Sequence, residues 1–144
     1  MVEEIKFKNK TFAMIITPSS FKKKGISFFT KNSFNQQVGF MKHHKDKKIL
    51  PHVHNKVIRK LSATTEVIYI IKGKLRVDFY TKFKKYLFSK VIKNKSILIL
   101  IDGAHGFKVL EKIEMIEIKQ GPYIEKKDKE KFIPIDESKI KIKK

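Results

Sequence analysis

The sequence predicts an all-β domain, and three stretches in its second half carry that prediction. Residues 66–71 are rich in β-branched and aromatic side chains, which favour strands. Apolar and polar residues alternate over residues 75–80, with the period of a strand that is buried on one face. Residues 96–101 are apolar except for Ser96 and predict a buried strand. The turn signal around Gly73 joins the first two stretches, so we expect a hairpin that begins at Glu66.

Further strands are expected on both sides of this hairpin. Residues 11–17 and 26–30 are short apolar patches that predict two strands, which flank the main sheet or pair with a second subunit. Residues 55–65 predict a loop with room for one helical turn. The charge run at 125–131 and the alternating Ile and Lys that follow predict an edge strand or a frayed end. The other expected strands are 36–42, 66–72, 74–81, 84–92, 96–101, 105–111 and 113–119.

Composition limits the class of protein. A length of 144 residues and an apolar content of 41% suit one domain with one hydrophobic core. No apolar run approaches the roughly 20 residues that cross a bilayer, so we expect no membrane. The first residues are acidic where a secretory signal is basic, so we expect a cytoplasmic protein. The chain has no cysteine, which excludes disulfides.

The net charge of +20 raises the question of a nucleic-acid partner. The basic residues are 32 lysines and only two arginines, Arg59 and Arg76. Nucleic-acid readers usually use the arginine fork for bases and phosphates. The lysines are spread over the whole chain, so the pattern favours a solvated lysine surface over a nucleic-acid site.

Three histidines and one glutamate form the main candidate site. His52 and His54 are two residues apart, so on a strand their rings lie on the same face, about 6–7 Å apart along it. Glu66 begins the predicted hairpin, and His105 begins a later strand. Imidazole and carboxylate ligands suit divalent Fe, Mn, Ni or Zn, so the four residues predict a metal centre. The alternative for each residue is an ordinary side chain at a strand end or in a turn.

These residues resemble the two sequence motifs of the cupin superfamily. His52, His54, Glu66 and Gly73 match the first motif, and His105 matches the single histidine of the second. The chain departs from the family in the longer gap between His54 and Glu66 and in lacking Pro-x-Gly before His105. It is closest to a poorly characterised group of small, metal-binding cupins, on the stretches Thr64-Thr65-Glu66-Val67, Val77-Asp78-Phe79-Tyr80, His105-Gly106-Phe107 and Lys119-Gln120-Gly121-Pro122-Tyr123.

The resemblance covers about residues 36–123 and carries expectations about fold, metal and assembly. It implies a cupin-type double-stranded β-helix, which is an antiparallel jelly-roll barrel. The chain is then a single domain over 1–144, with the barrel core at about 36–123, extra N-terminal strands and a charged tail at 124–144. The resemblance implies that the three histidines and Glu66 hold a divalent metal ion inside the barrel. Small cupins are commonly dimers, so we expect a homodimer.

The strand predicted over 113–119 supplies candidates for substrate binding. Glu117 and Lys119 share one face with Met115, while Ile116 and Ile118 share the other. With the polar face inward, Lys119 would hold an anionic substrate and Glu117 would act as acid or base. The alternative is a polar face directed at solvent.

Two further residues complete the candidate substrate site. Tyr123 borders the pocket or packs at its rim, and Arg59 clamps a carboxylate or phosphate or is a solvated loop residue. No catalytic residue is assigned.

The predicted function is that of a metal-binding small-molecule enzyme. Isomerisation or epimerisation of a sugar or oxo acid, and oxygenation if the metal is iron, both suit an ion with open positions. The alternative is a non-catalytic cupin that binds or senses a ligand in the same pocket. Nucleic-acid binding through the charge is a third hypothesis, which the lack of interleaved aromatic residues disfavours.

Overall fold

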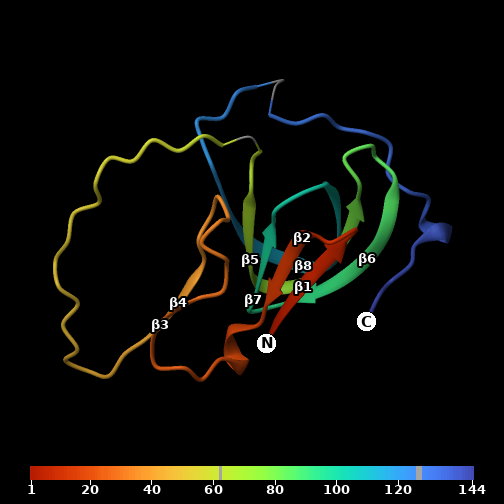
Figure 1. Ribbon diagram of the computed structural model, residues 1–144. Coiled ribbons are helices and arrows are strands. Elements are labelled where there is room, and N and C mark those ends of the chain that lie inside the picture. The colour runs from red at the N-terminus through yellow and green to blue at the C-terminus, as the bar shows by residue number, and fades with distance from the viewer. Residues whose placement is uncertain (62, 126–127) are drawn as a thin grey trace.

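The computed structural model describes residues 1–61, 63–125 and 128–144 (Figure 1). The expected all-β class is confirmed, because strands dominate and helical structure is limited to two short 3-10 turns in the described part. No helix of that part is long and apolar enough to cross a membrane. The elements are β1 (Val2–Phe7), β2 (Lys10–Ile16), η1 (Pro18–Ser20), β3 (Gly25–Phe28), β4 (Gly39–Lys42), β5 (Glu66–Tyr80), β6 (Tyr86–Lys93), β7 (Ser96–Leu100), β8 (Ala104–Lys119) and η2 (Glu137–Lys139).

Strand β5 organises the main sheet. Its first part pairs with β7 and its second part with β6, whereas β8 pairs with both parts, all antiparallel. A strand has only two edges. Strands β7 and β6 therefore pair with successive parts of one edge of β5, and β8 pairs with the other edge. Strand β2 pairs with β7, and β1 pairs with β2. The sheet curls into an antiparallel half-barrel (Figure 1).

The expected hairpin at Lys72-Gly73-Lys74 is wrong, because β5 runs through these residues without a turn. Gly73 has a φ of +98°, and a Cβ atom there would lie 2.3 Å from the carbonyl oxygen of Lys112 in β8. The register between β5 and β8 is irregular on both sides of this point. Gly73 therefore bends the strand, since only glycine combines this φ with so close a neighbouring backbone. Likewise, the two strands expected at 105–111 and 113–119 are one strand, β8.

Apolar side chains from both faces of the sheet are buried. The main cluster lies inside the curl and draws on β1, β2, β5, β6 and β7, with Ile70, Leu75 and Leu98 fully buried. A second cluster, around Ile16 and Ile99, lies on the opposite face. That face is covered by Phe29, Phe34 and Val38, which lie in the segment between β3 and β4. Burial on both faces explains why 96–101 is a nearly continuous apolar run.

The N-terminal strands join the main sheet instead of standing apart. Strands β1 and β2 extend it beyond β7, while β3 and β4 form a separate two-stranded sheet. The strand expected at 36–42 is confirmed only over Gly39–Lys42. Between β4 and β5, the described residues form a long loop without strand or helix, which arcs away from the sheet (Figure 1).

The C-terminal tail packs against the sheet. Its last residues form a short parallel bridge between Ile142 and Ser89 of β6. The Tyr86 hydroxyl accepts a hydrogen bond of 2.9 Å from the Lys141 amide, and the Tyr80 hydroxyl accepts one of 3.1 Å from the Ile135 amide. These contacts give the described part of the tail backbone partners at the edge of β6 and side-chain partners on β5 and β6.

A buried ion cluster secures this packing. Arg76 is 6% exposed and donates to both carboxylate oxygens of Asp78, at 2.8 and 3.0 Å, and to both of Glu137 in η2, at 2.7 and 2.8 Å. Lys108 of β8 lies 2.9 Å from Glu137, and the Ser89 hydroxyl donates to Asp78 at 2.5 Å. Hydrogen bonds from Arg76, then Lys108, lower the pKa of Glu137 to about 2. Through Glu137, the tail is thus ion-paired both to Arg76 of β5 and to Lys108 of β8.

The stability of this contact is expected to depend on acid pH. The pKa of Glu137 falls from its ordinary 4.5 to about 2 on folding, so its contribution is complete above about pH 4.5 and disappears as pH falls through 2. Glu137→Gln should therefore lower the free energy of unfolding at about pH 6, and the gap to the wild type should close towards about pH 2. Urea unfolding of both proteins across this range measures the gap. A gap that stays constant with pH would contradict the assignment.

Candidate functional site

The candidate site lies in a cavity of about 650 Å³ at the open end of the half-barrel. Both ends of β5 line it, through Glu66 and Tyr80. A straight strand of 15 residues would separate these ends by about 50 Å, so the bend of β5 brings them back together. The first residues of β8 and the tail segment around Phe132 complete the wall.

A contact between the side chains of Glu66 and His105 forms part of this wall. Nε2 of His105 lies 3.0 Å from Oε2 of Glu66, with both side chains partly buried. The hydrogen bond with His105 is the main cause that lowers the pKa of Glu66; burial opposes it, and the charges of His105 and Lys119 and a hydrogen bond with Glu117 add to it. Glu66 is therefore an anion facing an imidazole at the cavity.

The register between β5 and β8 settles which face of residues 113–119 turns inward. Glu66 pairs with Lys119 and Ile68 pairs with Glu117, and directly paired residues share a face. Because Ile68 belongs to the main core, Glu117 and Lys119 lie on the inner face, beside Glu66. Ile116 and Ile118 lie on the outer face and are exposed. The polar face of this strand is thus the one that faces the candidate site.

Lys119 connects this group to the residues that follow β8. Its Nζ atom lies 5.0 Å from the centre of the Tyr123 ring and 3.9 Å from Oε1 of Glu117. The ring partly stabilises the ammonium group without neutralising it. Lys119 therefore places a positive charge beside the carboxylates of Glu66 and Glu117.

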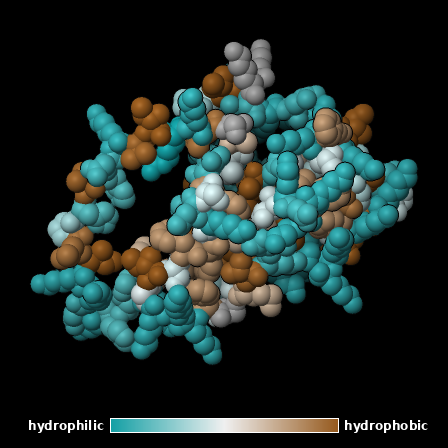
Figure 2. All heavy atoms as spheres, viewed as in Figure 1, coloured by the Kyte–Doolittle hydropathy of each residue, from teal (hydrophilic) through white to brown (hydrophobic). Residues whose placement is uncertain are grey.

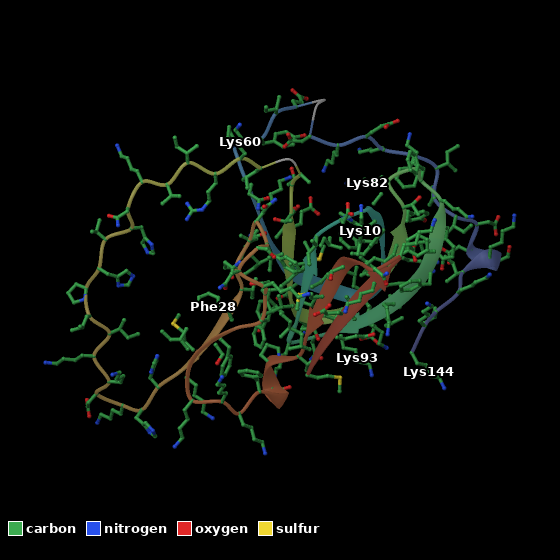
Figure 3. The ribbon with its side chains drawn as sticks, in the orientation of Figure 1. Lys10, Phe28, Lys60, Lys82, Lys93 and Lys144 are labelled. Carbon is green, nitrogen blue, oxygen red and sulfur yellow. The ribbon has the colours of Figure 1, made fainter. Side chains whose placement is uncertain are left out.

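The structure does not bring His52 and His54 to Glu66 and His105. Every described residue from 41 to 61 is exposed, and the loop side chains project into the surroundings (Figure 3). The rings of His52 and His54 lie close to each other, with centres 5.1 Å apart. Arg59 lies on the same exposed loop. Among the described residues, no three His, Asp or Glu side chains are grouped to hold a metal ion.

Some residues that shape the site were not singled out by sequence reasoning. Thr65 and Gln120 exchange two hydrogen bonds, from the Thr65 amide to Oε1 at 2.8 Å and from Nε2 to the Thr65 hydroxyl at 2.6 Å. These bonds tie the start of β5 to the end of β8, where Glu66 and Lys119 lie. Lys82 pairs with Asp102 at 2.9 Å across the cavity wall. Nothing in the sequence pattern pairs Asp102 with Lys82.

The cavity wall offers a carboxylate, Glu66, and an imidazole, His105, while Lys119 lies beside Glu66 but outside the cavity lining. A hydrogen-bonded carboxylate and imidazole can hold or exchange a proton, and both are ligand types for divalent transition metals. No model of a known protein family, no curated protein and no solved structure matches this chain.

Proposed function

We propose that the chain is a cupin-type metal-binding enzyme that acts on a small anionic molecule. Its divalent ion, Fe, Mn, Ni or Zn, is held by His52, His54, Glu66 and His105. The observation that carries this proposal is the 3.0 Å contact between Glu66 and His105 in the wall of a cavity of about 650 Å³. Pockets of roughly 300–1,000 Å³ suit small ligands.

The donor set fits such an ion. Metal ligands must be deprotonated, and the lowered pKa of Glu66 keeps its carboxylate charged at neutral pH. His54 is 12 residues before Glu66 in the chain, and an extended segment of that length spans up to about 40 Å. The loop that carries the two histidines can therefore fold back to the cavity in this proposal.

The exposed apolar residues of the loop favour such closure. Leu50, Val53 and Ile58 are 78%, 84% and 97% exposed, and Figure 2 shows apolar side chains spaced along the loop. The inner face of β8 also carries exposed apolar side chains, at Val109 and Met115. Folding the loop across the open side of the half-barrel removes both sets from water, which is favourable at about 25 cal/mol per Å². With the loop in place, the half-barrel would close towards the jelly-roll form.

The proposed chemistry is isomerisation or epimerisation of a sugar or oxo acid. When bound, the ion supplies polarisation of a carbonyl or hydroxyl oxygen, and iron would also suit oxygenation. Lys119 binds the anionic group of the substrate. Glu117, on the same face, accepts or returns a proton at carbon or oxygen. The tail segment around Phe132 limits access of water to the cavity.

Metal analysis tests the proposal. Protein purified without chelator should contain about one ion per chain, and His52→Ala and His105→Ala should each lose most of it. His43→Ala is the matched control, because His43 is exposed on the same loop but outside the ligand set. Elemental analysis by mass spectrometry gives the content. Metal-free wild type, or an equal loss in the His43 variant, would refute the proposed site.

Limited proteolysis tests the closure of the loop. The lysines between residues 45 and 60 are exposed, so trypsin should cut there rapidly in metal-free protein. Addition of the metal should slow this cleavage in the wild type and leave it unchanged in His54→Ala. Rapid cleavage of the metal-loaded wild type would show that the loop does not close.

A further inference from the structure

Strand β8 leaves one edge of the half-barrel open. It is 16 residues long, and in the described part of the chain it pairs with β5 alone. Six of its large apolar side chains are 39–53% exposed, namely Phe107, Val109, Leu110, Met115, Ile116 and Ile118. A long edge strand with exposed apolar side chains presents unpaired backbone donors and acceptors that favour pairing with another strand.

The charge of β8 differs from that of the whole chain. It contains three lysines and three glutamates, which cancel, whereas the chain carries a net charge of +20. Two copies of so basic a protein repel one another over most of their surfaces. Strand β8 itself adds no net charge to this repulsion, so it is the more suitable place for a second copy to approach.

The sequence of β8 is complementary to itself when two copies run antiparallel about Glu111. Phe107 then faces Met115, Val109 faces Ile113 and each Lys108 faces a Glu114 of the other copy, whereas Leu110 faces Lys112. Glu111 meets its own equivalent, but its carboxylate is already paired with Lys74 at 2.5 Å. Residues 110–112 of β8 lie opposite the bend of β5, where the register between the two strands is irregular. Regular cross-strand pairs between the two copies are therefore expected on either side of residues 110–112. The flanking pairs are Phe107 with Met115, Lys108 with Glu114 and Val109 with Ile113.

We propose that the protein forms a homodimer through antiparallel pairing of β8 with β8 of a second copy. The two sheets become continuous, and Phe107 and Val109 pack beside Met115 and Ile113 of the second copy. Cross-strand pairs of opposite charge and of apolar residues stabilise such an interface. Formation of this interface needs no bound metal ion, and its register places His105 opposite Glu117 of the second copy.

Of the remaining edge strands, β6 is bridged by Ile142 of the tail at Ser89, and β1 is a poorer interface than β8. Strand β1 has six residues, its pairing with β2 is interrupted between Ile5 and Lys6, and its Glu3 is already paired with Lys90. Short, irregular and charged edges resist pairing with another chain. The expectation that residues 1–30 pair with a second subunit is thus replaced by pairing through β8.

Sedimentation equilibrium tests the state of the wild type. We expect a mass of about 34 kDa, twice the 17.0 kDa of one chain, at micromolar concentration. Raising the salt should strengthen association, because it screens the repulsion between the two basic bodies. A monomer at every salt concentration would overturn the proposal.

Two charge variants test the interface itself. Glu114→Lys and Lys108→Glu each create like-charge pairs in the dimer, so each alone should lower the association constant about tenfold. Mixing the two variants restores both Lys–Glu pairs, and a heterodimer of wild-type affinity should form. Recovery on mixing also shows that each variant is folded.

Val2→Lys, on the opposite edge strand, is the matched control and should leave association unchanged. Circular dichroism of each variant checks its fold. Failure of the mixture to associate, or loss of the dimer in the Val2 variant alone, would overturn the assignment to β8.

Discussion

Replacing Arg76 by Met is expected to lower the free energy of unfolding by about 3–5 kcal/mol. Arg76 and Asp78 are both buried, and the guanidinium group is the partner of both oxygens of Asp78. Methionine fills much of the same volume but leaves the Asp78 charge buried, with the Ser89 hydroxyl as its one remaining hydrogen-bond partner among the described residues. An uncompensated buried carboxylate is far more destabilising than the loss of an exposed ion pair.

The chain contains a matched control for this substitution. Arg59, its other arginine, is exposed on the long loop, so Arg59→Met should change the free energy of unfolding by less than about 0.5 kcal/mol. Equilibrium unfolding in urea at neutral pH measures both variants. Loss of Arg76 should also release the tail through Glu137, which faster proteolysis after Lys139 or Lys141 would report. Equal effects of the two substitutions would contradict a buried ion cluster.

Gly73→Ala is expected to lower the free energy of unfolding by about 2–5 kcal/mol. Alanine at a φ of +98° is strained by about 1–3 kcal/mol. Its Cβ would also lie 2.3 Å from the Lys112 carbonyl oxygen, so β8 must move, at a further cost of about 1–3 kcal/mol. Because β5 bends at this residue, the movement should also separate Glu66 from His105.

Gly25→Ala distinguishes these two causes. Gly25 has a φ of +86°, but a Cβ there meets no atom within 4 Å, so only the backbone strain applies. The alanine at residue 73 should therefore be more destabilising than that at residue 25. Thermal and urea unfolding compare them, and the NMR titration of His105 reports whether its contact with Glu66 persists. Equal destabilisation would show that β8 does not approach Gly73 closely.

The positions of the strands were largely predictable, because the alternation of apolar and polar residues is a local pattern. The connections between the strands were not predictable from that pattern. A glycine between two strand-like stretches has the same local pattern in a hairpin turn and in a bent continuous strand. The choice at Gly73 depends on the backbone of β8, almost 40 residues later in the chain. The same holds for Arg76, whose burial depends on Glu137, 61 residues away. Such long-range partners leave no signal in a short window of sequence.

The candidate site was predictable in part. The proximity of Glu66 and His105 was expected from the motif and is present in the structure. The inward face of Glu117 and Lys119 could not be read from alternation, because both faces of that strand carry plausible inward residues. The register against β5 decides it. His52 and His54 stay on a loop that no contact with the sheet holds in place in the described structure, so their part in the site remains a prediction.

The pairing of β2 with β7 has a consequence for how the chain folds. Ala13 pairs with Leu100, so the first hairpin finds its partner only after most of the chain has been synthesised. Contacts between residues so distant in sequence slow folding, because the intervening chain loses entropy before the contacts form. Until then the apolar face of β2 is open to solvent in the nascent protein. We expect refolding on a timescale of milliseconds to seconds, with β5 to β8 assembling before the N-terminal hairpin docks.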